Sequence, residues 1–289
     1  MELQDTPPEF PIPVERVGFK GLRKRVVVRS PEGPVALDVT LDLFVDIPQD
    51  RKGAHLSRNV DAASLMGETS IPDESWSLEA LADSVHAELL KRHSYSASAL
   101  VRLRTTLWSR VVHDGLESLE PVDVEIVVKG SSTAKEYATS VTVTGMTVCP
   151  SAESTIKEMM GYEGLAPSHN QRVRLRGTVV SRKLVVIRAD EIAAQLWSSL
   201  SAPSLTLLKR DQEAKLVLSA FSRPKFAEDS VREAVVRMGC AFRDRLPPDA
   251  VLIAEVESFE SIHPQNVYAR ARASLAEIPR DICEKLLKA

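Results

Sequence analysis

The sequence predicts an α+β fold in which antiparallel sheets carry helices layered on one face. Strand-like runs come in adjacent pairs, amphipathic helical segments lie between the pairs, and this order occurs twice along the 289 residues. The two halves share no obvious sequence repeat, so the duplication rests on the order of elements alone. We expect an N-terminal half with an extended arm over residues 1–145, and a C-terminal half over residues 146–289.

The first half predicts a hairpin, a helix and two further strands. PEGP is a turn signal between two strand-like runs, which indicates an antiparallel hairpin. Residues 49–76 are polar and broken. Residues 77–93 predict a helix, because apolar residues recur at helical spacing after Ser77, a plausible N-cap. The strand-like runs are residues 25–30, 35–47, 94–109 and 122–130.

The second half follows the same plan. Its strand-like runs are residues 135–148, 172–180, 183–189, 251–259 and 267–275. Its predicted helices are residues 190–200, 224–246 and 279–289. In the second of these helices, five apolar residues are spaced to share one buried face, namely Phe226, Val231, Val235, Met238 and Phe242.

Composition and charge exclude several classes of protein. The net charge of −3 and the pI of about 6.1 provide no global basic field for nucleic acid. No stretch approaches the roughly 20 apolar residues that span a bilayer, and the N-terminus lacks the pattern of a signal peptide. The cysteines, Cys149, Cys240 and Cys283, are odd in number and sparse, which predicts no disulfide framework and a reducing, cytoplasmic location.

Several polar clusters could carry chemistry, although each has an ordinary explanation. Cys149 ends an apolar strand before a Pro, where a buried inert cysteine is common. The loop at 50–58 suits an anion, but solvated turns of that composition are commoner. Glu213 and Glu228 lie near helix starts, where the helix dipole favours carboxylates anyway. Other candidates stand in polar loops at strand ends, namely His169, Glu260 and His263. The chain contains no GxGxxG, P-loop or GxSxG motif.

Six of these segments, taken in order, resemble the type IB GTP cyclohydrolases, and the surrounding text is closer to the archaeal branch. The segments are DRKGAHLSR, GMTVCPSAE, SHNQR, LLKRDQE, PKFAEDSVR and ESIH. The resemblance extends from about Leu3 to Ala269. It implies tandem tunnelling-fold (T-fold) units, each strand–strand–helix–helix–strand–strand, in a homotetramer with active sites at or near subunit interfaces.

The resemblance also implies an active site. Three ligands hold one divalent metal and leave a coordination position open, which is typical of a catalytic site; here they are Cys149, Glu213 and His263. This donor set permits Fe(II), Mn(II) or Zn(II). By the same resemblance His169 and Glu260 transfer protons, and Glu228 binds the guanine edge. The candidates for the triphosphate are His55, Ser57, Arg58 and Lys209.

The implied reaction is metal-dependent hydrolysis at C8 of GTP with release of formate. The product is 7,8-dihydroneopterin triphosphate or its 2′,3′-cyclic phosphate, early in folate- or methanopterin-type synthesis. Two departures from the family pattern are Ser151, where relatives often carry a second Cys, and Gln265, where they often carry a second His. Neither residue is among the ligands carried over.

Two other functions remain open from the sequence. One is the nitrile reductase of queuosine synthesis, a relative in the same fold that uses a catalytic Cys and NADPH without a metal. Glu213 and His263 argue against that enzyme, because it needs no such ligands. The other is a non-catalytic purine-binding protein.

Overall fold

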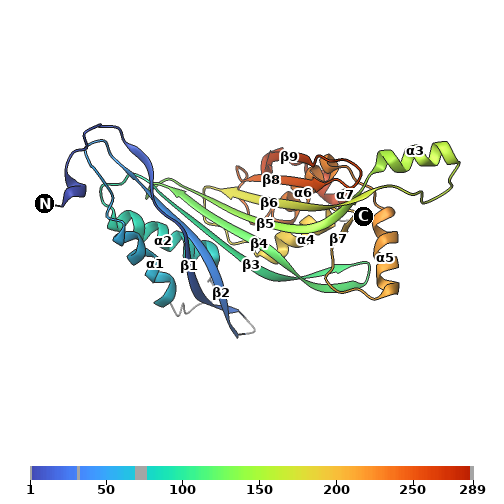
Figure 1. Ribbon diagram of the computed structural model, residues 1–289, viewed down its shortest axis with the longest axis horizontal. Coiled ribbons are helices and arrows are strands. Elements are labelled where there is room, and N and C mark those ends of the chain that lie inside the picture. Colours follow the sequence, from blue (N-terminus) through green and yellow to red (C-terminus); the bar gives the residue numbers. More distant parts are fainter. Residues whose placement is uncertain (1, 31–32, 69–76, 287–289) are drawn as a thin grey trace. The chain divides into compact units, whose positions relative to one another are not determined.

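The computed structural model describes residues 2–30, 33–68 and 77–286. Within these residues one nine-stranded sheet runs in the order β1-β2-β3-β4-β5-β6-β8-β9, and β7 pairs with β5 (Figure 1). The pairs β1–β2, β2–β3, β6–β8 and β8–β9 are all antiparallel. The predicted antiparallel sheet is confirmed.

The chain forms two compact units. Unit 1 comprises Met1–Thr106, Glu125–Thr139 and Ser181–Val186, and unit 2 comprises Leu107–Val124, Ser140–Val180 and Ile187–Ala289. The long strands β3 (Ala99–His113), β4 (Leu116–Gly130) and β5 (Lys135–Val148) contribute residues to both units. The expected division into 1–145 and 146–289 stays a prediction, and residue 145 lies inside β5.

Unit 1 is built on the hairpin of β1 (Val14–Ser30) and β2 (Gly33–Ile47). The helices α1 (Ser57–Glu68) and α2 (Leu78–Arg92) pack on each other, and α1 packs on β1 (Figure 1). The hydroxyl of Ser77 accepts a hydrogen bond from Ala80 N–H at 3.0 Å, which confirms the predicted N-cap. The short 3₁₀ helix η1 (Leu3–Asp5) precedes the hairpin. The core of unit 1 includes Leu41, Leu43, Leu81, Val85 and Leu89.

A buried carboxylate fixes the register between β1, β2 and β3. Asp42 on β2 is fully buried, and its Oδ1 accepts hydrogen bonds from Gly21 N–H and Arg104 Nη2, both at 2.8 Å. Gly21 adopts φ +77, a left-handed conformation that favours glycine, at the point where the β1–β2 register shifts. Arg102 completes the ion pair at 3.4 Å. A buried charge is stable only when paired in this way.

Unit 2 places helices against the strands β6 (Asn170–Ser181), β8 (Val251–Phe259) and β9 (Val267–Ser274). The helix α6 (Ala227–Ala241) packs on β8 and β9, and α4 (Ala189–Ser198) packs on α6 (Figure 1). The approach is close at Gly177, where an added Cβ would lie 2.7 Å from Leu196 and 2.8 Å from Met238. The other elements of this unit are α3 (Pro150–Met160), β7 (Ala202–Pro203), α5 (Arg210–Phe221), η2 (Leu275–Glu277) and α7 (Arg280–Leu286).

Several sequence predictions of local structure were wrong. Residues 183–188 form no strand, and Leu184 and Val186 are 41% and 44% exposed. Phe226 is 44% exposed and precedes α6, whereas the other four residues of the predicted apolar face are buried. Helices α1 and α3 were not predicted. Parts of the predicted turn, the polar segment and the closing helix lie outside the described residues, at 31–32, 69–76 and 287–289.

The sequence predicted no disulfide framework, and the structure contains one disulfide that this prediction did not include. Cys240 on α6 and Cys283 on α7 form a disulfide, with their Cα atoms 5.3 Å apart, and only Cys149 is free. Residue counts cannot show this pairing, because it depends on two helices meeting in space. The disulfide closes a loop of 43 residues and fixes α7 to α6. Among the described residues, no helix has the length and apolar character needed to cross a bilayer.

A hydrogen-bonded histidine links α2 to α1 in unit 1. His93 is fully buried, its Nδ1 lies 2.7 Å from the hydroxyl of Tyr95, and its Nε2 lies 2.8 Å from Asn59 Oδ1. The amide of Asn59 in turn donates to the carbonyl of Leu43 at 3.1 Å. These partners suit a neutral ring that accepts at Nδ1 and donates at Nε2. Burial is the main reason that the pKa of His93 is lowered from 6.5 to about 4, and Arg58 and His55 add to this effect.

We predict that His93 makes the protein less stable in mild acid. The unfolded chain protonates this ring near pH 6.5 and the folded chain only near pH 4, so stability present above pH 6.5 is lost as the pH falls toward 4. The loss is on the order of 3 kcal/mol for this group. Urea unfolding at pH 7 and pH 4.5 measures it. The His93→Gln variant should lose less stability than wild type over this range, and an equal loss would contradict the assignment.

Candidate active site

The candidate site begins where β5 and β6 are tied together. The backbone N–H of Cys149 donates to the carbonyl of His169 at 3.1 Å, and the hydroxyl of Ser168 donates to the carbonyl of Cys149 at 2.7 Å. Cys149 follows β5 and is the N-cap of α3, with Pro150 in the first turn. Pro at this position starts a helix, because its missing N–H would have no intrahelical partner. The backbone of Cys149 is therefore held beside Ser168 and His169 by two independent contacts.

Each of three strand ends contributes a pair of residues two positions apart. The pairs are Thr147 with Cys149 at the end of β5, His169 with Gln171 at the start of β6, and Ser258 with Glu260 at the end of β8. In each pair the candidate residue lies one position beyond the strand. Side chains two positions apart point to the same side of a strand. In each pair one member is a candidate from the sequence, and the other is a hydroxyl or amide that supports the site. This spacing was the available signal for Thr147, Gln171 and Ser258, to which the sequence reasoning gave no role.

A chain of hydrogen bonds fixes the tautomer of His169. Gln171 Nε2 donates to Thr147 Oγ1 at 2.9 Å, so its Oε1 is left as an acceptor. That oxygen lies 2.9 Å from His169 Nδ1, which must then carry the proton. In the neutral ring Nε2 then carries the lone pair, and the side chain is only 13% exposed. Gln171 thereby prepares His169 to accept a proton.

Glu260 and His263 lie next to His169. Ser258 donates to Glu260 Oε1 at 2.8 Å, while Glu260 Oε2 lies 3.9 Å from His169 Nδ1. The Glu260 side chain is 7% exposed, whereas His263 is exposed in the loop after β8. The rings of His169 and His263 are 6.3 Å apart and nearly perpendicular. Four of the predicted site residues therefore gather at one end of β5, β6 and β8, namely Cys149, His169, Glu260 and His263.

Two helices that carry predicted carboxylates contact the residue before Cys149. Val148 packs in one apolar cluster with Leu216 of α5, and its carbonyl accepts a hydrogen bond from Lys225 N–H at 2.9 Å, just before α6. Glu213 lies one helical turn before Leu216, and Glu228 lies in the first turn of α6. Both carboxylates are exposed. Lys209 is the exposed N-cap of α5, and its N–H is bonded to Gln212.

The turn between β3 and β4 anchors α5. Ser219 of α5 donates to the carboxylate of Asp114 and lies 2.8 Å from His113 Nε2, and Arg223 pairs with Asp114 at 3.0 Å. The hydrogen bond from Ser219 holds the pKa of Asp114 below its usual range. The same hydroxyl contacts both the carboxylate and the imidazole, so this is not the linear arrangement of a nucleophilic triad. It fixes the helix that carries Glu213.

The donor atoms at this site suit a catalytic divalent metal. The thiol of Cys149, the imidazole of His263 and nearby carboxylates are the donor types that Zn(II), Fe(II) and Mn(II) accept. Within the described part of the chain, however, no three His, Cys, Asp or Glu side chains come close enough together to hold an ion. Cys149 and His263 each adjoin His169, whereas Glu213 is exposed on α5, so the described residues of one chain present the three donors without gathering them.

The remaining predicted residues lie in unit 1, in the loop before α1 and in its first turn. His55 is 9% exposed, and its ring nitrogens contact Glu2 at 2.7 Å and Asp5 at 2.9 Å. Ser57 is the first residue of α1 and is exposed. Arg58 donates to the carbonyl of Arg92 at 2.8 Å.

Residues 1–269 match the family described as type I GTP cyclohydrolase folE2. The GTP cyclohydrolase MptA of Aeropyrum pernix is 44% identical over 281 residues, which cover 96% of this chain and 97% of that protein. The MptA of Methanoregula boonei is 32% identical over 305 residues, at 97% and 93% coverage. The chain belongs to the type I GTP cyclohydrolase folE2 family. The predicted family and the predicted class of enzyme are confirmed.

The fold has a counterpart among solved structures. A hyper-thermostable mutant of AgUricase aligns with a TM-score of 0.50 over 90% of this chain and 91% of that chain. The sequences are 9% identical, so this likeness shows the fold alone. Because uricase is a tandem T-fold protein, the predicted tandem T-fold is confirmed.

We predict that Gln171 controls the tautomer of His169. In Gln171→Leu the ring loses its acceptor at Nδ1, so the proton should redistribute toward Nε2, and kcat should fall about 10- to 100-fold. The ¹⁵N chemical shifts of selectively labelled histidine report the tautomer directly. Gln171→Glu keeps an acceptor at the same place and serves as the matched control. An unchanged Nδ1–H population in Gln171→Leu would refute this role.

Proposed function

We propose that the chain hydrolyses GTP at C8 of guanine, releases formate, and forms 7,8-dihydroneopterin triphosphate or its 2′,3′-cyclic phosphate. The observation that carries this proposal is the gathering of Cys149, His169, Glu260 and His263 at the ends of three adjacent strands. The relatives named MptA support the same reaction class, because that of Aeropyrum pernix is 44% identical over nearly the whole chain. Pterin synthesis is the corresponding pathway.

The proton transfers follow from the hydrogen bonds of His169 and Glu260. His169 Nε2 accepts a proton and returns it to a ring nitrogen of the purine, since its Nδ1 is already committed to Gln171. Glu260 Oε2 is the free oxygen of a carboxylate whose Oε1 is bonded to Ser258, so it can orient or deprotonate the attacking water. The low exposure of both side chains limits competing solvent.

The guanine and the triphosphate need different partners. Glu228 is assigned to the paired donors N1–H and the 2-amino group, which two carboxylate oxygens can accept together. Lys209, His55, Ser57 and Arg58 are assigned to the triphosphate, because cations and hydroxyl groups match its oxygens. These assignments rest on the motifs that carry the residues.

Cys149, Glu213 and His263 would hold one divalent metal, Fe(II), Mn(II) or Zn(II). When bound, such a metal lowers the pKa of water toward about 7 and so supplies hydroxide at neutral pH. We further propose a homotetramer, in the cytoplasm, with active sites at subunit interfaces. A site at a subunit interface would account for three metal ligands that the described residues of one chain do not bring together.

Two other functions make different predictions. A nitrile reductase would oxidise NADPH and need no metal, whereas a purine-binding protein would hold GTP without changing it. Gln171 and Ser258, which are hydrogen-bonded to His169 and Glu260, favour catalysis over both of these alternatives. A binding module has no use for a fixed histidine tautomer, and a thioimide-forming cysteine has no need of the proposed metal ligands Glu213 and His263.

Cys149→Ala should abolish metal-dependent GTP turnover and leave the assembly intact. The thiolate is a proposed ligand, and removing it leaves two. Metal content by mass spectrometry, turnover and light scattering measure the three outcomes. Ser151→Ala, an exposed neighbour on α3, is the matched control and should behave as wild type. Normal metal content with normal activity in Cys149→Ala would reject the ligand assignment.

Glu228→Ala should lose guanine affinity, because the donor edge of the bound base would be left without acceptors. The expected cost is about 1–3 kcal/mol in binding. Titration calorimetry with GTP measures it, and Glu158→Ala, an exposed carboxylate on α3, is the control. Unchanged Kd and KM in Glu228→Ala would exclude this residue from base recognition.

A further inference from the structure

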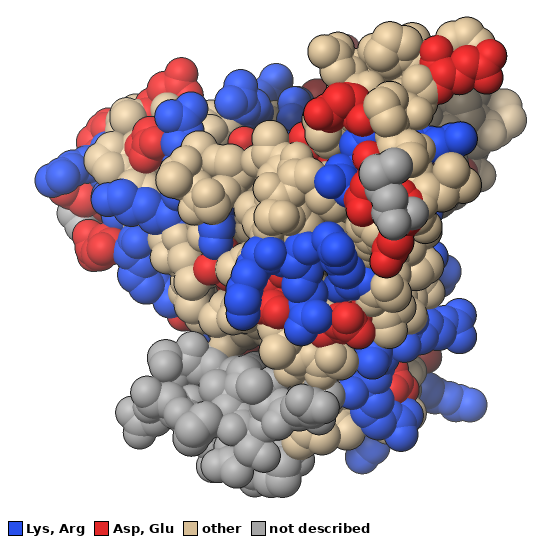
Figure 2. Space-filling view, turned by 90° about the vertical axis from the view of Figure 1, so that its left-hand side faces the viewer, with Lys and Arg blue, Asp and Glu red and all other residues tan. Residues whose placement is uncertain are grey.

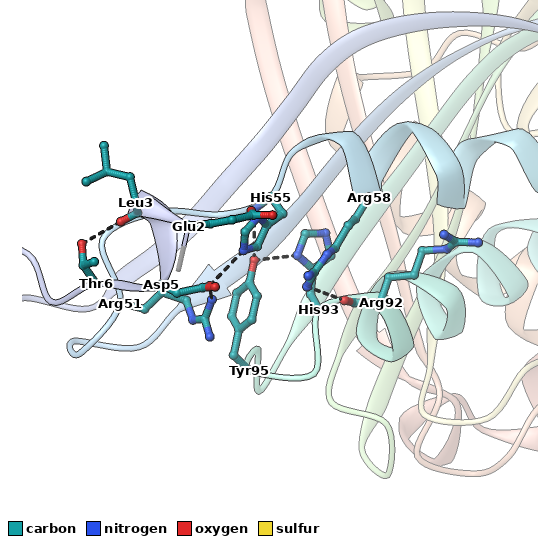
Figure 3. Close-up of polar contacts among 10 residues, drawn as sticks. All are labelled: Glu2, Leu3, Asp5, Thr6, Arg51, His55, Arg58, Arg92, His93 and Tyr95. Atoms are coloured by element: carbon teal, nitrogen blue, oxygen red, sulfur yellow. Dashed lines mark hydrogen bonds and ion pairs between the residues drawn. The ribbon is translucent and has the colours of Figure 1, made fainter.

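Asp5 lies against side chains of the kind that bind anions. Its Oδ1 accepts hydrogen bonds from the guanidinium of Arg51 and from His55 Nε2, the latter at 2.9 Å. Glu2 Oε2 lies 2.7 Å from His55 Nδ1. Figure 3 shows His55 between these two carboxylates. Both ring nitrogens of His55 can donate only in the doubly protonated, cationic form.

Tyr95 forms one wall of this group. The guanidinium carbon of Arg51 lies 4.0 Å from the centre of the Tyr95 ring, which is a cation–π contact. The Tyr95 hydroxyl receives the backbone N–H of His55 at 3.3 Å and extends toward His93 at 2.7 Å (Figure 3). Arg51 and His55 are therefore oriented by contacts that do not involve Asp5, in addition to those that do.

The N-terminal segment is docked on the same loop by its backbone. Lys52 N–H donates to the carbonyls of Gln4 and Thr6 at 3.1 and 2.8 Å, and Gly53 N–H donates to Gln4 at 3.1 Å. The hydrogen bond from His55 is the foremost reason that the pKa of Asp5 is below its usual range, with Arg51 adding to it. The carboxylate of Asp5 thus occupies the side chains of Arg51 and His55 in this loop.

The side chains that hold Asp5 can also bind a phosphate group, because a guanidinium pairs with phosphate oxygens as well as with carboxylate oxygens. A planar guanidinium and an imidazolium directed at one oxygen atom are the donors that phosphate oxygens accept. The loop also carries Lys52, and Arg58 follows in the first turn of α1. The side of the molecule where α1 and α2 lie in Figure 1 shows Lys and Arg side chains gathered with Asp and Glu among them (Figure 2).

We propose that Arg51, His55 and Tyr95 form a phosphate-binding site. Asp5, aided by Glu2, is an internal anion that occupies this site and that a phosphate-bearing ligand displaces. This rests on the proposed function, in which His55 and the adjoining Ser57 and Arg58 meet the triphosphate. It adds Arg51 and Tyr95 to that site. It also means that the N-terminal segment and the nucleotide exclude each other at this site. The apparent affinity for the ligand therefore falls as the fraction of molecules in which Asp5 occupies the site rises.

The test is titration calorimetry of the full-length protein with inorganic tripolyphosphate at pH 7. Asp5→Asn should bind tripolyphosphate about tenfold more tightly than wild type, because the competing anion is lost. Asp50→Asn is the matched control. It removes the same charge from an exposed neighbour of Arg51, and it should change the affinity less than about threefold. Arg51→Ala should abolish binding in either background.

Equal or weaker binding by Asp5→Asn than by wild type would overturn the proposal. Glu2→Gln is a second, milder variant that should also raise the affinity for tripolyphosphate. It tests the proposal even if Asp5→Asn folds poorly. No step of turnover enters the measurement. A protein that released no formate from GTP yet bound tripolyphosphate as described would disprove the proposed function alone, and the converse would disprove this inference alone.

Discussion

The site depends on the main-chain hydrogen bond from Cys149 N–H to the carbonyl of His169. This bond joins the end of β5 to the start of β6, so a thiol and an imidazole from separate motifs come together. The pairing of Arg172 with Phe259 then brings the end of β8, and with it Glu260, to the same edge. Because backbone bonds set all three strand ends, the side chains are positioned by the sheet rather than by flexible loops. His263 is the exception, since it lies in the loop beyond β8.

Much of the fold could be predicted, because the strands carry long apolar alternations and Ser77 is a clear helix start. The failures have physical causes. Helix α1 buries Ala62, Ala63 and Met66, which lie at helical spacing, but half of its residues are polar and it stands in a segment that reads as a polar loop. Pro150 ends β5 but also starts α3, and only the first effect was considered. Residues 183–188 are apolar enough for a strand but form none.

The site was predictable through its motifs and not through periodicity. Cys149, His169, Glu260 and His263 are each unremarkable in isolation, and their convergence depends on pairing between strands far apart in sequence. The supporting residues Thr147, Gln171 and Ser258 could have been found from the two-residue spacing along each strand. The cluster around Asp5 could not have been found in this way, because nothing in the sequence indicates that an N-terminal carboxylate contacts Arg51 and His55. The Cys240–Cys283 disulfide was missed for the same reason.

The central claim is that this set of residues opens the purine ring and does not merely bind it. The most direct measurement incubates the purified wild-type protein anaerobically with GTP and Fe(II), Mn(II) or Zn(II), then quantifies formate and identifies the pterin by mass. The account predicts one formate released for each GTP consumed, with a dihydroneopterin product, in the presence of at least one of these metals. GTP left intact with all three, or consumed without formate, would contradict it.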